Sequence, residues 1–367
     1  MVFVKRACVV LGLGFLLTLS ELVLGQQKGD VHLPDSVTNA HNSFLVIPYA
    51  FYTPETKWGF GISSGYYFSR EESRRISNIQ GMAVYTLENQ FKMSISPKIF
   101  SDDKRSFFSG KFEVQNYPDK FYGIGRDADS LQNFSWRNLS FLFQRQKVVF
   151  SDLMIGYQVQ LDYGKMKDPI PEERYPNQDI YGNGEFFTSA LGGLVTWDSR
   201  DNMFFARSGS FYKISLLSNS KIFLSDYNYS RVVADIREFG EVTRSTSIGF
   251  QFYGDFTWGD VPFQRLPMEG GSEILRGLRQ GRYRDNMMMA AQLELRANIS
   301  RKLFATVFVA AADVAPEVKK FALKEYTPSF GGGLRYKLNK AGVNLRFDTG
   351  YTPGGKALFY FTAMEAF

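Results

Sequence analysis

Side chains able to perform acid–base or nucleophilic catalysis are scarce in this chain, which has two histidines, His32 and His41. Both precede the first segment expected to form a strand, so a serine hydrolase on a barrel wall would lack its base. The sequence shows no metal-ligand cluster and no phosphate loop. Histidine-free acid chemistry by Glu294 or Asp348 is an alternative, although inward-facing charges in a wet interior are ordinary. We therefore expect no enzyme, no cofactor and no metal site.

Arginine and acidic side chains offer another chemistry, which is charge pairing inside a cavity. The segment GGSEILRGLRQGRYRD, residues 270–285, lies in the longest connection that the sequence predicts. A guanidinium such as that of Arg276 requires a carboxylate in fork geometry inside a polar cavity, and a following glycine, Gly277, allows close backbone approach. The alternative is a solvated basic loop. The surrounding elements decide between the two.

Those elements are predicted to be strands, because the hydrophobic period is close to two along most of the chain. Aromatic residues make up 16% of the chain and glycines number 33, which is typical of strands and turns. Mean hydropathy is −0.22, and beyond the N-terminal leader no segment is apolar enough to span a bilayer as a helix. In residues 286–299 one face carries Met287, Met289, Ala291, Leu293, Leu295, Ala297 and Ile299, and the other carries Met288, Ala290, Gln292, Glu294, Arg296 and Asn298.

The same alternation recurs in residues 342–351, GVNLRFDTGY. An apolar outer face and a polar inner face are what a membrane barrel with a wet lumen requires. In a soluble sandwich, which is the alternative, the apolar face would contact a second sheet. Alternation therefore leaves two fold classes open.

Connection lengths favour the membrane barrel. Tight turns are predicted at 150–151, 241–242, 301–302 and 340, and they alternate with long stretches at 118–132, 166–184, 259–285 and 315–328. Short periplasmic turns and long external loops are a property of outer-membrane barrels, and closure leaves no unpaired edge in hydrocarbon. We predict an all-β fold, an antiparallel transmembrane β-barrel of about sixteen strands closed in the outer membrane. The predicted strands are roughly 43–52, 57–69, 76–87, 90–101, 106–117, 133–150, 152–165, 185–199, 208–219, 227–240, 243–258, 286–300, 303–314, 329–339, 341–352 and 357–367.

The first 42 residues are predicted to lie outside the barrel. Basic residues at 5–6 precede an apolar stretch at 7–19, which is shorter than the about 20 residues of a spanning helix, and Gly25 favours cleavage ahead of Gln26. An uncleaved anchor helix is the alternative. Cleavage would remove the single cysteine, Cys8, which suits an exported chain without disulfides. We expect a signal peptide at 1–25, a short periplasmic lead-in at 26–42 and the barrel at 43–367.

The chain ends LFYFTAMEAF, in which Phe359, Phe361, Ala363 and Phe367 are expected to share one face of the last strand. A last strand that ends on phenylalanine resembles the C-terminal signal that barrel-assembly machinery reads. The alternative is an ordinary final strand with an interfacial aromatic residue. Both interpretations place this segment in the barrel wall.

Residues 197–212, WDSRDNMFFARSGSFY, span a predicted inner turn and resemble a recurring turn sequence of the BamA/TamA family of outer-membrane proteins. The resemblance rests on Asp198, Arg200, Asp201 and Gly209, and Ala206 stands where the family usually has proline. We interpret this periplasmic turn motif as structural, a charged turn whose glycine supplies an unusual backbone conformation.

Residues 270–285 resemble the sixth-loop motif of the same family, in which an Arg-Gly pair lies at the tip of a loop folded back into the lumen. Arg276 and Gly277 match that pair, and GRYRD at 281–285 matches the segment that follows, through Gly281, Arg282 and Asp285. The resemblance implies that Glu294, in the ELR sequence that ends at Arg296, is a carboxylate partner of the loop in the lumen.

Residues 307–316, VFVAAADVAP, resemble the following strand of the family and depart from it. Where the family has a second carboxylate partner, this chain has Ala310, and where the family has a later glycine, it has Ala312. Leu278 stands in place of the aromatic residue that follows the Arg-Gly pair in the family. Asp313 matches a later acid and could compensate only if the loop sits differently. We therefore expect a weaker or rearranged lock between loop and wall. A smaller likeness is FYGIG at 121–125, which recurs in short members of the family.

The resemblance implies a barrel of the protein-assembly and translocation superfamily, as a short member that lacks POTRA domains, because 26–42 cannot hold one. We expect it to take part in inserting or translocating outer-membrane or surface proteins, in the bacterial outer membrane. Outer-membrane lipid and periplasmic chaperone or assembly subunits are the expected partners. The alternative is a passive pore or structural barrel that has lost the assembly function. The net charge of +6 is modest and scattered, so no nucleic-acid partner is expected.

Overall fold

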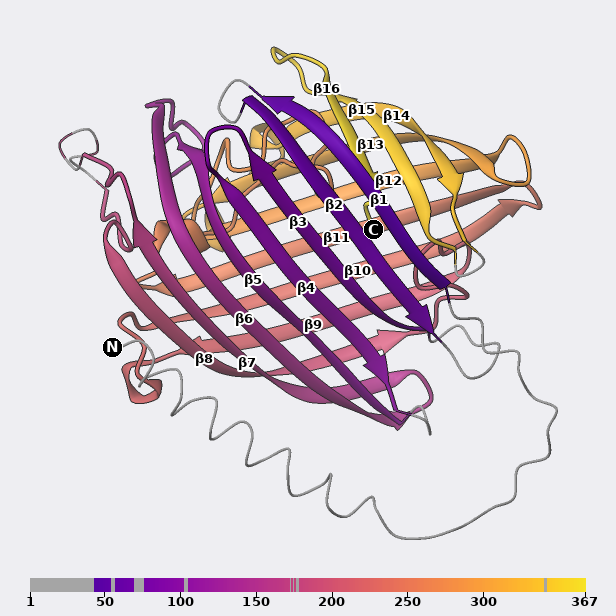
Figure 1. Ribbon diagram of the computed structural model, residues 1–367, viewed down its shortest axis with the longest axis horizontal. Helices are drawn as coiled ribbons and strands as arrows, with labels where there is room; N and C mark the ends of the chain where they lie inside the picture. The colour runs from indigo at the N-terminus through magenta and orange to yellow at the C-terminus, as the bar shows by residue number, and fades with distance from the viewer. Residues whose placement is uncertain are drawn as a thin grey trace, which may run out of the picture.

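The chain forms one antiparallel sheet that curves around a lumen (Figure 1). The computed structural model describes residues 43–53, 57–68, 76–101, 105–171, 173, 175, 178–339 and 342–367. In this part of the chain, sixteen strands follow one another in sequence order, and each pairs antiparallel with its neighbours. The predicted number of strands and their antiparallel arrangement are confirmed. They are β1 (Ser43–Thr53), β2 (Lys57–Phe68), β3 (Ser77–Thr86), β4 (Phe91–Phe100), β5 (Ser106–Phe121), β6 (Gln132–Phe150), β7 (Leu153–Met166), β8 (Glu185–Asp198), β9 (Gly209–Asn219), β10 (Tyr229–Thr243), β11 (Thr246–Gly259), β12 (Met287–Asn298), β13 (Leu303–Ala315), β14 (Thr327–Lys337), β15 (Asn344–Tyr351) and β16 (Leu358–Ala363).

The two faces of the sheet differ in polarity, as alternation along β12 shows. Leu293 and Leu295 are 41% and 39% exposed on the outer face, whereas Glu294 and Arg296 are buried on the lumen face. The predicted arrangement of apolar outside and polar inside is therefore confirmed along this strand except at its start, where Met287, expected on the outer face, is 3% exposed. Among the described residues, no helix has the length and apolar character to cross a membrane.

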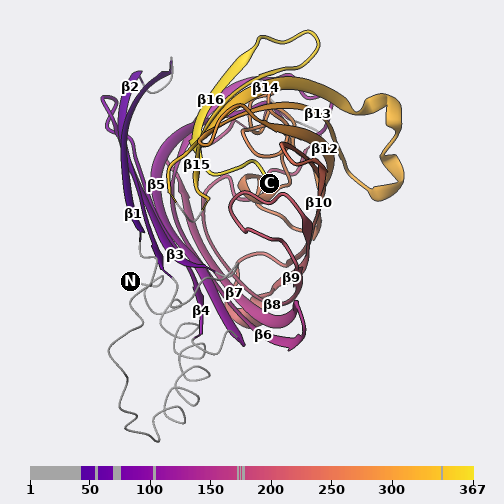
Figure 2. The same cartoon turned by 90° about the vertical axis from the view of Figure 1, so that its right-hand side faces the viewer.

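The connections divide the barrel into two ends. At one end, which we call the inner end, short turns join β6 to β7 at 151–152 and β10 to β11 at 244–245. At the opposite, outer end the connections at 167–184, 260–286 and 316–326 are long. The longest of these connections, 260–286, is called the lumen loop below. Figure 2 shows that the curved wall of strands encloses segments of the chain in its interior.

The sheet has two edges, β1 and β16. Each strand of the described chain pairs with its sequence neighbours, and no pairing joins β1 to β16 there. β1 has 11 residues and β16 has 6, so the two edges differ in length. The described pairing thus forms the sixteen-stranded wall without the last step of closure.

An aromatic cluster lies at the outer end. Its buried members come from the ends of β5–β8 and β10 and from two outer connections, and they include Phe121, Phe134, Trp136, Ile170, Tyr175, Phe186, Tyr229 and Phe263. Phe263 of the lumen loop packs edge-on against Phe121 at 4.9 Å and Phe134 at 5.2 Å between ring centroids. The lumen loop is therefore part of the cap as well as of the interior.

Candidate functional site

The lumen loop is a hairpin-like element held by its own backbone. The amide of Gly271 donates to Leu278 at 2.9 Å, and the amide of Gly281 donates to Glu269 at 2.9 Å. An isolated antiparallel bridge joins Met268 to Arg284. These bonds fix the loop tip, Arg276–Gly277, at a defined place in the lumen.

The tip presses against the backbone of β15. Gly277 has φ 107, and a Cβ there would lie 2.5 Å from the amide nitrogen of Tyr351. A Cβ on Gly350 would lie 2.5 Å from the carbonyl carbon of Arg276. The amide of Gly277 donates to the hydroxyl of Tyr360 at 2.9 Å. Glycine is needed on both sides because backbone contacts backbone here and one conformation is left-handed.

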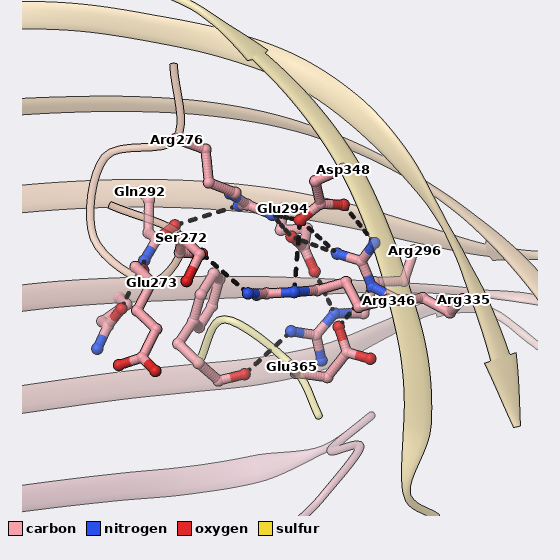
Figure 3. A network of polar contacts seen from close by, with 12 residues as sticks. Ser272, Glu273, Arg276, Gln292, Glu294, Arg296, Arg335, Arg346, Asp348 and Glu365 are labelled. Carbon is pink, nitrogen blue, oxygen red and sulfur yellow. Dashed lines mark hydrogen bonds and ion pairs between the residues drawn. The ribbon is translucent and has the colours of Figure 1, made fainter. Parts of the chain in front are cut away.

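The guanidinium of Arg276 is fully buried and bonded on several sides (Figure 3). Its Nη1 donates to Glu294 at 2.7 Å and to Asp348 at 2.9 Å, and its Nη2 donates to Gln292 at 3.2 Å. The guanidinium carbon lies 3.4 Å from the centroid of the Phe308 ring. Charge-assisted hydrogen bonds and a cation–π contact together offset the desolvation of the buried charge.

Three further arginines complete what we call the arginine network, made of Arg276, Arg296, Arg335 and Arg346 with the acids Glu294, Asp348 and Glu365. Arg335 donates to Asp348 and, at 2.7 Å, to Glu365. Arg296 donates to Glu294 at 2.8 Å.

The arginine network also contacts backbone of distant segments. Arg296 donates to the carbonyl of Ala206 at 3.0 Å and to that of Phe367 at 3.2 Å. Arg346 donates to the carbonyl of Ser272 at 3.0 Å. The network thus joins the lumen loop, strands β12, β14 and β15, an inner turn and the last residues of the chain. Removing one partner from such a buried set leaves an uncompensated charge.

The acids around Arg276 differ in part from those that the resemblance implied. The structure brings Arg276 and Glu294 together, while Ala310 offers no carboxylate. Asp348 supplies the second acid from β15 instead. Glycines in β14 make room for it, because a Cβ on Gly333 would collide with the Asp348 side chain. The sequence placed Asp348 on the inward face but did not reveal that it pairs with Arg276. The run of glycines at Gly331–Gly333 could have indicated it, because it leaves space for an inward side chain on the neighbouring strand.

The predicted partner Asp313 lies outside the arginine network. It pairs with Arg126 of the connection after β5 at 2.9 Å, near the outer end. Arg282 of the lumen loop donates to the carbonyl of Ala128 at 2.6 Å and pairs with Asp129 at 2.8 Å. The second half of the loop motif, which includes Gly281 with φ 74, therefore contacts the connection after β5 at the outer end. It takes no part in the pairing of Arg276 with Glu294 and Asp348.

The FYGIG segment is the part of the wall that this second half contacts. The amide of Gly125 donates to the carbonyl of Arg284 at 2.8 Å. Asp285 is buried close by, and burial raises its pKa. Glu269, also buried, has an unpaired Oε2, and burial together with the charge of Asp313 raises its pKa to about 8. Glu269 is thus a buried acid whose Oε2 has no hydrogen-bond partner among the described residues.

The periplasmic turn motif forms a compact charged turn at the inner end. Arg200 forks onto Asp198 at 2.9 and 2.8 Å, and Asp201 accepts the amides of Arg207 and Ser208. Gly209 has φ 93, and a Cβ there would lie 2.4 Å from the carbonyl oxygen of Ser199. The geometry fits a structural turn, and the carbonyl of Ala206 links it to Arg296.

The C-terminal segment divides between two faces. Phe359 and Phe361 are 70% and 58% exposed on the outside of β16, whereas Phe367 is 5% exposed in the lumen and stacks on Phe239. The prediction of one shared face is wrong for Phe367, because β16 ends at Ala363 and Met364 takes φ 69, which turns the chain inward. The role of these residues as an assembly signal stays a prediction.

These features define the class, an antiparallel membrane barrel whose lumen is occupied by a locked outer loop. The sequence profile of the Omp85 superfamily domain matches residues 77–363, and the chain belongs to this superfamily of outer-membrane barrels. Among solved structures it is similar to BamA from Haemophilus ducreyi lacking POTRA domains 1-3, with a TM-score of 0.57 and 15% identity over 88% of this chain and 69% of that chain. It is also similar to CdiB from Acinetobacter baumannii, with a TM-score of 0.55 and 12% identity over 88% of this chain and 59% of that chain. No curated protein matches the sequence significantly.

Proposed function

We propose that this barrel takes part in inserting or translocating outer-membrane or surface proteins. The observation that carries the proposal is the pair of edges, β1 and β16, each of which pairs with one neighbouring strand in the described wall. An unpaired edge is a template for strand addition, and in hydrocarbon its groups need partners. A client strand would supply them.

A cavity beside these edges supports the proposal. It has a volume of about 360 Å³ and is lined by Ile47 and Tyr49 of β1, by Phe361 and Thr362 of β16 and by Glu273 of the lumen loop, among others. The arginine network holds the loop near this cavity through Ser272 and Arg346. The pairing of the lumen loop with the arginine network would therefore set the shape of the cavity between β1 and β16 without contacting the client protein.

A deletion strain tests the proposal against the alternative. The strain is complemented with wild type, with Arg276→Ala, or with Glu241→Gln as a control at an exposed pair. We expect specific barrels or surface proteins to be lost from the outer membrane of the deletion and Arg276→Ala strains and restored by the other two. An unchanged outer-membrane proteome on deletion would overturn the assembly role.

The passive pore remains the second candidate because the lumen loop does not fill the barrel. A cavity of about 330 Å³ lies at the inner end, lined by Lys98, Lys213 and Arg237 among others. If the aromatic cluster at the outer end blocks the lumen, it would oppose free passage. A pore predicts steady conductance in planar bilayers that Arg276→Ala barely changes, whereas a capped barrel predicts little conductance from the wild type.

The expectations for the N-terminus concern residues 1–42, which lie outside the described residues. We propose export with cleavage ahead of Gln26, followed by partnership with periplasmic chaperone or assembly subunits. N-terminal sequencing of the chain from outer membranes tests the cleavage, and a start before residue 20 would contradict it. Pulldown from native membranes tests the partnership.

A further inference from the structure

A cavity of about 380 Å³ lies in the outer half of the lumen, between the lumen loop and strands β4–β6. It is separate from the arginine network. Its wall is strongly basic, and the charged residues that line it are Lys92, Arg265, Arg279 and Arg284 with Glu113 and Asp119. A volume of this size holds on the order of ten water molecules at about 30 Å³ each.

Arg284 is the unusual member of this cavity. It is 1% exposed, yet its side chain has no carboxylate within ion-pair distance among the described residues. Its Nη1 donates to the carbonyl of Phe263 at 3.1 Å and its Nη2 to that of Lys120 at 3.4 Å, while its Nε has no partner. Burial lowers the pKa of Arg284. A buried cation without a counter-charge is costly unless an anion reaches it.

The carboxylates nearest to Arg284 already pair with other cations, and the charge of Asp119 acts on Arg284 without forming an ion pair with it. Lys92 and Lys111 share the carboxylate of Glu113 at 3.5 and 2.7 Å. Arg279 pairs with Asp119 at 3.2 Å, and Arg265 pairs with Asp162 at 2.6 Å. Among the described residues around the cavity, these four cations and Arg284 face three carboxylates, which leaves a net surplus of two positive charges.

We propose that this cavity binds a phosphate group, held by Arg284 and Arg279, with Arg265 and Lys92 beside it. A phosphate group carries about −1.5 to −2 charges at pH 7 and three acceptor oxygens, which matches the surplus, whereas one carboxylate would match half of it. Guanidinium groups suit phosphate because they donate two parallel hydrogen bonds. The side chain of Arg279 is 38% exposed, so the cavity communicates with solvent.

Binding of inorganic phosphate to the purified full chain in detergent tests the site, by calorimetry at constant ionic strength set with chloride. We expect saturable binding to the wild type and a loss of affinity of about tenfold or more in Arg279→Gln, because one charge-assisted hydrogen-bonding partner is removed. Lys98→Gln, in the inner cavity, is the matched control and should bind as the wild type does. Arg279 is partly exposed, so its variant should fold even where Arg284→Gln does not.

A second arm identifies the source of the phosphate. The chain is reconstituted in phosphatidylcholine vesicles with and without phosphatidic acid, and the affinity for inorganic phosphate is measured again. Competition by phosphatidic acid that Arg279→Gln abolishes supports a lipid phosphate, and equal affinity in both vesicles supports free phosphate. Absence of saturable phosphate binding to the wild type, or equal binding by Arg279→Gln, would overturn the proposal.

Discussion

Replacing Asp348 by asparagine tests the loop lock, because the substitution keeps the shape of the side chain and removes its charge. Asp348 pairs with Arg276 at 2.9 Å and also with Arg335, and all three side chains are fully buried. Breaking a buried ion pair from one side costs about 3–5 kcal/mol. Glu294 continues to pair with both arginines, so we expect the lower end, about 3 kcal/mol, which is on the order of a hundredfold in the folding equilibrium.

The measurement is the free energy of unfolding from urea titrations of the barrel in lipid vesicles, extrapolated linearly to water. Glu241→Gln is the control, because its pair with Arg207 at 3.0 Å is half exposed. Such a surface pair contributes about 0–1 kcal/mol. A loss for Asp348→Asn no larger than that of the control would refute the lock.

A second substitution asks whether the position of the carboxylate matters. Ala310 faces Gln292 across β12 and β13, and Gln292 accepts from Arg276. Ala310→Asp should therefore recover at least about 1 kcal/mol in the Asp348→Asn background while destabilising the wild type, a coupling that a double-mutant cycle measures. Additive effects would show that the two positions do not serve the same guanidinium.

The remaining predictions concern the tip, the cap and the tail. Gly277→Ala should lower the free energy of unfolding by at least about 2 kcal/mol more than Gly354→Ala does. Both glycines have positive φ, but only at Gly277 would the new Cβ lie 2.5 Å from backbone. Equal losses for the two variants would contradict the close approach. Burial raises the pKa of Glu269 from 4.5 to about 8, so the folded chain keeps a proton that the unfolded chain releases. Stability should then fall by about 5 kcal/mol as pH rises between these values, and Glu269→Gln should remove that fall in urea titrations across pH. An identical pH profile for the variant would count against it. Phe367→Ala should cost about 3 kcal/mol of unfolding free energy because the ring is 5% exposed against Phe239, whereas Phe359→Ala, outside the lumen, should cost less.

The strands were predictable from sequence because alternation is a local property. In β12 buried and more exposed residues alternate from Met288 to Ala297, so the faces could be read directly and the bounds to within two residues. The end of β16 could not, because Met364 leaves the strand through a positive φ that nothing in LFYFTAMEAF requires. The inward turn of Phe367 depends on Phe239 and Arg296, which are distant in sequence.

The site was half predictable. Arg276 and Glu294 could be paired through the family pattern, and the loss of an acid at Ala310 was visible. The replacement by Asp348 was not, because it depends on how deep the loop tip lies against β15 and on the space left by Gly333. Asp313, the acid that the resemblance offers as a substitute, lies near the outer end beside Arg126.

Site-specific photo-crosslinking at β1 tests the proposed function most directly. A photoreactive residue at Val46, which is 41% exposed on β1, is compared with one at Ile214, which is 55% exposed on β9 in the opposite wall. We predict crosslinks from Val46 to newly exported outer-membrane or surface proteins and none from Ile214. Equal crosslinking at both positions, or none at Val46 in a strain with normal export, would contradict the proposal that clients enter at the β1 edge.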